Sequence, residues 1–121
     1  MSESSHLVFA LLDMTLLTPS NFDENILTDE IDLKCVFFWG QDCPNCDVAK
    51  KSLSTDVDIV RLRKLNWYHV NVYDHFDLGT RFGLYGIPVF IFFKKGKSLG
   101  RITSFPGLER FLEAIDRLLA R

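Results

Sequence analysis

The chain has 121 residues, a formal net charge of -2 and 25% charged residues, which suit one domain with a single hydrophobic core. This charge balance argues against a nucleic-acid-binding surface, and no run of basic residues alternates with aromatic ones. No segment approaches the roughly 18 apolar residues of a membrane-spanning helix. We therefore expect a cytoplasmic protein that binds neither nucleic acid nor membrane.

The first apolar segment, residues 6–12, is expected to form a strand or a short helix. It does not resemble an export signal, because Glu3 precedes it and Asp13 follows it without a small-residue cleavage site. We assign residues 1–12 to an N-terminal extension and residues 13–121 to one domain. A short strand over residues 13–17 and a helix within residues 18–26 come next, the helix being capped by Thr18 or Ser20.

Residues 33–39, LKCVFFW, are a continuous run of strand-forming apolar residues. Such a run is typical of a central strand that is covered on both faces. Cys35 lies within it, and we expect this cysteine to be a buried, unreactive side chain. The strand leads directly into the segment DCPNC, which holds the other two of the three cysteines at C-x-x-C spacing.

The middle of the chain predicts one helix and one strand. From Pro44 onward, apolar residues recur at spacings of three and four, which indicates a helix of several turns with an interruption near residues 54–56. Residues 66–74 alternate as a strand does. Its two predicted faces are Tyr68, Val70 and Val72 on one side and Trp67, His69, Asn71 and Tyr73 on the other.

The last third of the chain predicts a short helix over residues 78–82, a strand over 88–93, a turn around Gly96 and a partner strand over 98–102. A final amphipathic helix begins at Pro106. Strands that alternate with helices early and form a hairpin late predict an α/β fold with a central mixed β-sheet flanked by helices on both faces.

Three landmarks in this order resemble the thioredoxin family over about Asp13 to Arg121. The first is FFWGQDCPNC, a strand followed by C-x-x-C at a helix start. The second is YGIPVFIFFKKGK, in which the family's cis-proline would be Pro88, and the third is the terminal helix. The resemblance implies a thioredoxin fold for residues 13–121 and a thiol-disulfide oxidoreductase that reduces protein disulfides.

The physical setting of the two cysteines suits that chemistry. Cys43 falls at a helix N-cap with Pro44 at the first helical position, where its missing N–H costs nothing. The free N–H groups of the first turn and the helix dipole would favour a Cys43 thiolate. Cys46 lies on the same side one turn later, within disulfide reach and more buried.

The resemblance also implies roles for individual residues. Cys43 would attack the substrate disulfide, and Cys46 would resolve the resulting mixed disulfide. Pro88 would turn the backbone of Ile87 towards an extended substrate segment. The remaining expected site residues are Pro44, Asn45, Trp39, Asp42 and His69 as active-site support, and Gly86 and Ser104 beside Ile87 and Pro88 as substrate-binding positions. We expect a monomer without a cofactor, recycled by a thiol reductase that the sequence does not identify.

Three alternatives were weighed against redox exchange. A structural zinc site needs four ligands, and the C-x-x-C supplies two of them. The others would have to come from Cys35, His69 and His75. Because Cys35 and His69 lie on predicted core strands, we expect no metal. A purely structural disulfide would close a short loop and stabilise little. The third alternative, a thioredoxin-fold adaptor whose groove around Gly86, Ile87 and residues 103–105 binds a partner, stays open.

The sequence departs from the family pattern around the cysteines. Asp42 stands where thioredoxins usually have Trp, Pro-Asn replaces Gly-Pro, and Phe37 and His69 replace a buried Asp and its neighbouring Lys. We therefore hypothesise that Asp42 and Asp47 oppose the Cys43 thiolate, so its pKa is less depressed than at a bare helix N-terminus. With no acid at Phe37, His69 or water would carry the proton in the resolving step.

Overall fold

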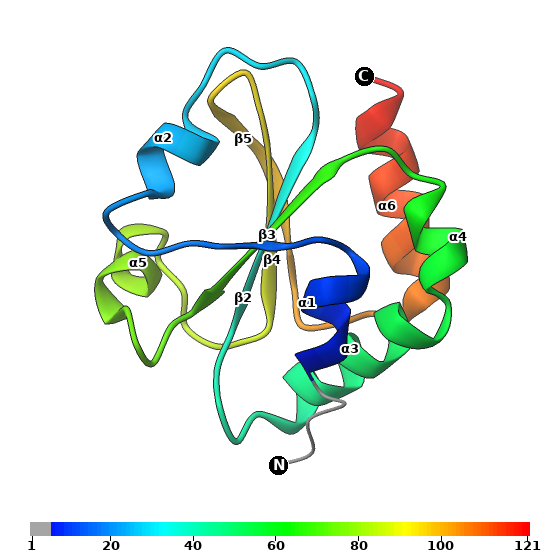
Figure 1. Cartoon of the computed structure of the whole chain (residues 1–121), viewed down its shortest axis with the longest axis horizontal. Helices are drawn as coiled ribbons and strands as arrows, with labels where there is room; N and C mark the ends of the chain where they lie inside the picture. Colours follow the sequence, from blue (N-terminus) through cyan, green and yellow to red (C-terminus); the bar gives the residue numbers. More distant parts are fainter. Residues whose placement is uncertain (1–5) are drawn as a thin grey trace.

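The computed structural model describes residues 6–121, and a five-stranded sheet runs through its middle in the order β1-β3-β2-β4-β5 (Figure 1). Strands β1 (Thr15–Leu16), β3 (Asn66–Asn71) and β2 (Lys34–Trp39) are parallel. Strands β4 (Val89–Lys94) and β5 (Lys97–Thr103) add an antiparallel hairpin beside β2. The predicted α/β fold with a mixed sheet is therefore confirmed.

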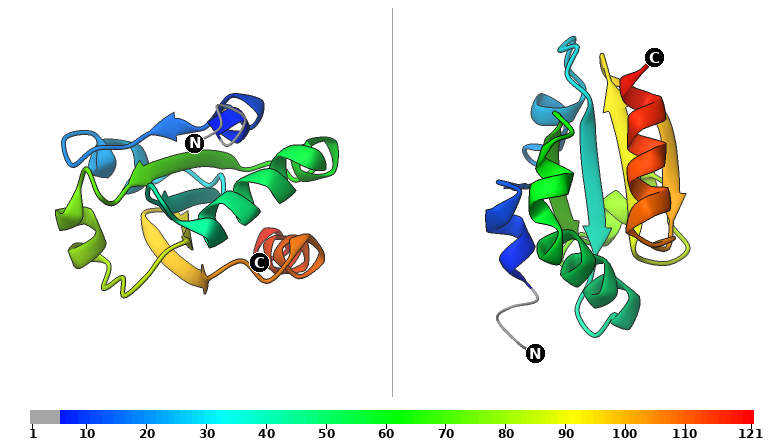
Figure 2. Two further views of the ribbon diagram at one scale, coloured as in Figure 1. Left: turned by 90° about the horizontal axis from the view of Figure 1, so that it is seen from below. Right: turned by 90° about the vertical axis from the view of Figure 1, so that its right-hand side faces the viewer.

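Helices cover both faces of the sheet (Figure 2). One face carries α1 (Leu7–Leu11), α3 (Pro44–Thr55), α4 (Val57–Arg61) and α6 (Leu108–Leu119). The other carries α2 (Phe22–Ile26) and α5 (Phe76–Arg81). None of these helices within residues 6–121 is long and apolar enough to cross a membrane.

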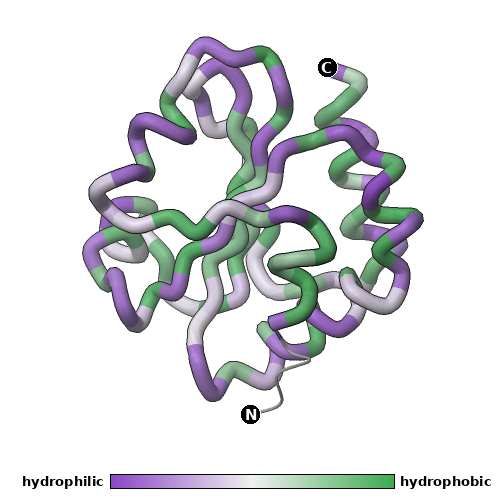
Figure 3. Tube along the Cα trace, viewed as in Figure 1, coloured by the Kyte–Doolittle hydropathy of each residue, from purple (hydrophilic) through white to green (hydrophobic). Residues whose placement is uncertain are grey.

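Strand β2 is the centre of the core, and every residue in it is buried. Alternate side chains serve the two faces: Phe37 and Trp39 pack beneath the first group of helices, and Val36 and Phe38 beneath the second. Hydrophobic residues recur along the central strands and the inner side of the helices (Figure 3). This double burial explains why β2 is apolar without interruption. Strand β2 ends at Trp39, so the chain passes directly from this buried strand into the C-x-x-C segment.

Three helix starts differ from prediction: α5 begins at Phe76 and not at residue 78, and α2 and α6 differ as follows. Neither Thr18 nor Ser20 caps α2, whose N-cap is Asn21. The Asn21 side-chain oxygen instead accepts the Thr18 N–H at 2.7 Å, which closes a turn ahead of the helix. The last helix begins at Leu108 and not at Pro106, because Gly107, its N-cap, has a φ of 97° that a right-handed helix cannot contain. The predicted interruption after α3 is confirmed and lies at Asp56.

The segment of residues 6–12 contains helix α1, one of the two forms expected for it. Its side chains Val8 and Leu12 are buried in the core formed with α3 and α6. The boundary between extension and domain after residue 12 stays a prediction, and residues 1–5 lie outside the described part of the chain. Helix α1 thus packs into the same hydrophobic cluster as Cys43 and Cys46.

Candidate active site

The two cysteines of the C-x-x-C segment form a disulfide at the start of α3, with a Cα–Cα separation of 5.2 Å. Cys43 is the N-cap in an extended conformation, and Pro44 occupies the first helical position. The backbone N–H of Cys46 donates a hydrogen bond of 3.1 Å to the Cys43 sulfur. A helix N-terminus thus directs an N–H and its positive dipole end at this sulfur, an arrangement that stabilises a thiolate.

The two sulfurs differ in exposure. Cys43 retains 8% of its surface exposed, whereas Cys46 is fully buried. Three neighbours of the pair, Asp42, Pro44 and Asn45, are exposed around Cys43. Asp42 has a φ of 55°, a left-handed conformation that Asp tolerates better than most residues. Of the two sulfurs, an incoming molecule meets Cys43 first.

The segment before β4 lies against the Cys43 sulfur. The Cys43 sulfur is 3.8 Å from the carbonyl oxygen of Ile87, and the Ile87–Pro88 peptide bond is cis. Pro88 is anchored in turn, because its carbonyl accepts the Ser104 N–H at 2.9 Å. A Cβ at Gly86 would contact nothing within 4 Å, so the fold alone does not require glycine there. The four positions expected to bind substrate therefore lie together beside Cys43.

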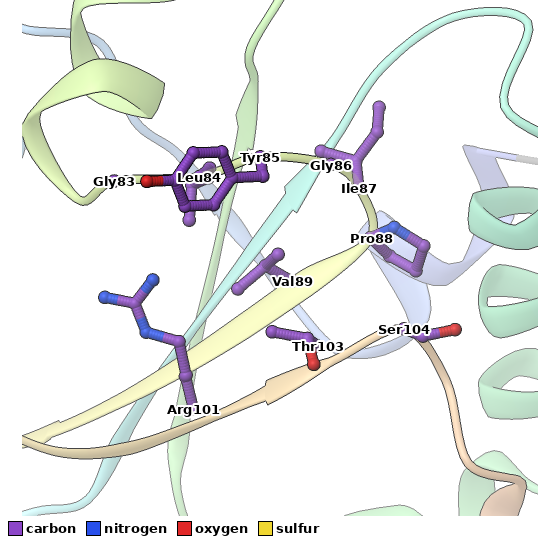
Figure 4. A pocket seen from close by; sticks show the side chains of 10 residues that line it. All are labelled: Gly83, Leu84, Tyr85, Gly86, Ile87, Pro88, Val89, Arg101, Thr103 and Ser104. Carbon is purple, nitrogen blue, oxygen red and sulfur yellow. The ribbon is translucent and has the colours of Figure 1, made fainter.

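A surface cavity of about 420 Å³ opens next to this segment (Figure 4). Leu84, Tyr85 and Pro88 line one side, and Arg101 and Thr103 of β5 line the other. Tyr85 is fully exposed, so its ring stands free at the rim. The cavity offers apolar surface and the guanidinium group of Arg101, which donates a hydrogen bond to the Phe82 carbonyl at 2.8 Å.

Sequence reasoning missed a contact between Tyr73, Ile87 and Gly40. A Cβ built on Gly40 would lie 2.6 Å from the Tyr73 ring and 2.8 Å from Cδ1 of Ile87. Those two side chains therefore close over the backbone just before Asp42. A glycine directly after a buried strand was the available signal, but its partners come from distant parts of the chain.

Trp39 and His69 lie beneath the cysteines and are joined by a hydrogen bond. The indole Nε1–H of Trp39 donates to Nδ1 of His69 at 3.0 Å, and the Phe9 ring stacks on the imidazole at 3.7 Å between centroids. Burial, reinforced by repulsion from Lys50 and His6, lowers the pKa of His69 to about 4. The imidazole is thus neutral at physiological pH and carries its proton on Nε2. Within residues 6–121, no hydrogen bond joins His69 to either cysteine.

Lys50 is the second residue that sequence reasoning missed. It lies one turn after Cys46 on the buried side of α3, with its Nζ 3.9 Å from the centre of a Trp39 ring. Burial lowers the pKa of this ammonium group. The signal in the sequence was a lysine at a position of the helix where the periodicity calls for an apolar residue.

The free cysteine Cys35 is buried in β2, as predicted, and burial raises the pKa of its thiol well above the usual value. Among residues 6–121, no three His, Cys, Asp or Glu side chains come together in a way that could hold a metal ion. Of the three cysteines, Cys43 and Cys46 are thus the two joined in a disulfide.

Comparison with known proteins gives concordant results. Residues 28–119 match the family model described as thioredoxin-like domain. The chain is 29% identical over 106 residues to thioredoxin of Staphylococcus haemolyticus and 28% identical over 106 residues to thioredoxin of Staphylococcus saprophyticus. Both matches cover 85% of this chain and 95% of the relative.

Solved structures with the same fold include two further thioredoxins. Thioredoxin f2 of Chlamydomonas reinhardtii superposes with a TM-score of 0.75 at 17% identity, covering 87% of this chain and 95% of that one. The thioredoxin of Malassezia sympodialis gives a TM-score of 0.70 at 20% identity, with 86% and 89% covered. At these identities the structural likeness establishes the fold.

Proposed function

The chain belongs to the thioredoxin-like family, and from this premise we propose that it is a protein-disulfide reductase acting by dithiol exchange through Cys43 and Cys46. Family membership and a C-x-x-C pair at disulfide distance support thiol-disulfide oxidoreductase activity in general. The observation that carries the proposal is the unequal exposure of the pair at the start of α3, with Cys43 accessible and Cys46 sealed.

The first step uses the reduced protein. The Cys43 thiolate, held by the Cys46 N–H and the dipole of α3, attacks one sulfur of the substrate disulfide. A bond forms between Cys43 and that sulfur, and the substrate disulfide breaks. The other substrate sulfur leaves with the electron pair and takes up a proton from solvent.

The second step releases the substrate. The Cys46 thiolate attacks Cys43, the Cys43–Cys46 bond forms, and the remaining substrate sulfur leaves with the electron pair. The substrate has then gained two electrons and the protein has lost two, so it returns to the disulfide form described above. A thiol reductase of the cell must supply two electrons to restart the cycle.

Substrate recognition would use the segment beside Cys43. An extended peptide could pair with the backbone of Ile87 as an added strand does, with Gly86, Pro88 and Ser104 shaping the approach. The proximity of the Ile87 carbonyl to the Cys43 sulfur supports this placement. The proposed partners are thus protein disulfides and a thiol reductase. We propose that the protein acts as a monomer in the cytoplasm.

Reduction of insulin with dithiothreitol as electron source tests the proposal. The wild-type chain should accelerate the reaction, and Cys43→Ser should abolish the acceleration. In a separate incubation without dithiothreitol, reduced Cys46→Ser should leave a trapped mixed disulfide with insulin. Cys35→Ser is the matched control, because Cys35 is buried away from the disulfide, and it should retain activity. Equal rates for wild type and Cys43→Ser would favour an adaptor in which the cysteines are idle.

A further inference from the structure

Lys50 is a buried lysine on α3, four residues after Cys46, and it plays no part in the mechanism above. Its side chain is 1% exposed, and its Nζ has no hydrogen-bond partner among residues 6–121. Burying an ammonium group without a partner is costly, and lysine at such a depth is normally paired. In the disulfide form, this cation has a long contact of 3.9 Å to the half-exposed Asp47 carboxylate and lies over the Trp39 ring, but it has no hydrogen bond.

The Lys50 side chain is directed at the start of α3. Long side chains in a helix lean towards its N-terminus, and residues four apart share a face. In agreement, the Lys50 Nζ reaches back to within 3.9 Å of the Asp47 carboxylate, the residue directly after Cys46. It also lies over the ring of Trp39, which packs in the same core cluster as Cys46.

The groups that face Lys50 from other elements do not neutralise it. His69 on β3 and His6 at the start of α1 are imidazoles, which carry either no charge or a positive one, and burial lowers the pKa of both. Asp47 on α3 is 47% exposed and too distant for a hydrogen bond. Phe37, on the strand below, has no ionisable group. Among these groups, only the half-exposed Asp47 carboxylate brings a negative charge near Lys50.

We propose that the Lys50 ammonium is the built-in counter-charge of the Cys46 thiolate, the anion that forms on reduction and attacks Cys43 in the resolving step. This inference rests on the proposed dithiol exchange. Cys46 loses its proton to solvent, the Lys50 ammonium stays protonated, and the two buried groups form an ion pair. When Cys46 then bonds to Cys43, the negative charge departs on the substrate sulfur. Lys50 thus acts as a positioning residue in the resolving step, where its positive charge stabilises the Cys46 thiolate that attacks Cys43.

The proposal predicts that Lys50 stabilises the reduced form selectively. An ion pair with a thiolate exists only after reduction, whereas contact with Trp39 exists in both forms. Replacing the charge should therefore destabilise the reduced protein relative to the disulfide form. The difference should grow as pH rises through the range in which the Cys46 thiol ionises, because a protonated thiol gains nothing from the ammonium.

The test compares Lys50→Met with Lys51→Met, which removes the same charge from the exposed neighbouring lysine. Equilibration with reduced and oxidised glutathione at pH 7 to 9 measures the disulfide equilibrium of each protein. We expect Lys50→Met to shift it at least tenfold towards the disulfide, which is about 30 mV for a two-electron couple. We expect Lys51→Met to stay close to wild type.

A second measurement follows the resolving step directly. A preformed mixed disulfide between Cys43 and thionitrobenzoate releases its chromophore when Cys46 attacks, and the rate is recorded against pH. Lys50→Met should raise the midpoint of this profile by about one pH unit, equivalent to a tenfold change in thiol acidity. Lys50→Arg keeps the positive charge and should leave the midpoint close to that of wild type, whereas Lys50→Gln, a second neutral variant, should raise it and so provides a test even if Lys50→Met does not fold.

An unchanged glutathione equilibrium and an unchanged midpoint in Lys50→Met would overturn the proposal and leave Lys50 as a packing partner of Trp39. Equal losses of stability in the oxidised and reduced forms would do the same. These measurements need no protein substrate. A failure of insulin reduction would therefore count against the reductase function alone, and a failure here against the role of Lys50 alone.

Discussion

The indole of Trp39 and the imidazole of His69 are joined by a 3.0 Å hydrogen bond in which the histidine is the acceptor. The bond links the last residue of β2 to the middle of the neighbouring strand β3. An imidazolium has no free lone pair, so protonation of Nδ1 would break this bond. The structure at this point therefore depends on a histidine that stays neutral.

We predict a pH-dependent contribution of His69 to stability. Its pKa is about 4 in the folded protein, below the ordinary value of 6.5, so the unfolded chain binds more protons between these pH values. The free energy of unfolding should fall as pH drops from 6.5 to 4, by about 2 kcal/mol from this group after allowing for partial screening. The pH profile of urea unfolding should be flatter in His69→Gln, which keeps an acceptor for Trp39, than in wild type.

The control for this experiment is His75→Gln, at a histidine outside the Trp39 cluster. Carboxylates titrate in the same pH range, but they are present in all three proteins and cancel in the differences. A His69→Gln profile parallel to that of wild type would show that the histidine is not responsible.

Phe37 should be a principal source of stability. Its ring is fully buried on β2 and stacks on Phe90 of β4 with 4.7 Å between centroids. Truncation removes buried apolar surface and leaves a cavity, so Phe37→Ala should lower the free energy of unfolding by about 3–5 kcal/mol. Phe76→Ala is the matched control, because Phe76 is 69% exposed on α5, and its effect in urea unfolding should stay within about 1 kcal/mol. Similar losses in both variants would contradict this assignment.

The features that could be predicted from sequence are those set by neighbouring residues. The apolar run of β2 follows from burial on two faces, and the placement of Cys43 before Pro44 fixes the N-cap of α3 by local geometry alone. Each of these two features can be predicted from a short stretch of sequence. The position of Pro88 beside the cysteines is predicted only through the resemblance to the thioredoxin-like family.

The features that sequence could not provide depend on contacts between distant segments. Lysine can extend its head to solvent from most helix positions, so the burial of Lys50 becomes visible only once α1 covers it and Phe9 lies 5.4 Å from its Nζ. The approach of Tyr73 to Gly40 likewise joins the end of β3 to the end of β2. Neither contact leaves a periodic pattern in the chain.

Gly40 should matter for activity more than for stability. A Cβ at this position must displace the Tyr73 ring or the end of Ile87, and both are side-chain groups with partial exposure that can move. Because Ile87 contacts the Cys43 sulfur, we expect Gly40→Ala to lower kcat/KM for insulin reduction about tenfold, the scale of a small misplacement at a reacting group.

A second substitution tests whether this loss arises from crowding. Tyr73→Ala removes the nearest obstacle and should restore most of the activity of Gly40→Ala in the double variant. The free energy of unfolding should change by no more than about 1 kcal/mol in Gly40→Ala. Full activity of the single variant, or no recovery in the double variant, would exclude the contact as the cause.

Asp42 should set the reactivity of Cys43 in the reduced protein. Its carboxylate is exposed and directly precedes the N-cap sulfur of α3, so its negative charge opposes the thiolate that the helix start favours. Two exposed charges a few ångströms apart in water interact by less than about 1 kcal/mol. Asp42→Asn should therefore raise the rate of Cys43 alkylation by iodoacetamide near neutral pH, by up to about fivefold. Asp58→Asn, in α4 beyond the other end of α3, should have no effect.

Because salt screens exposed charges, the difference between wild type and Asp42→Asn should shrink between 0.05 M and 1 M NaCl. A difference that persists at high salt would point to a change in the geometry of the N-cap instead of a charge effect.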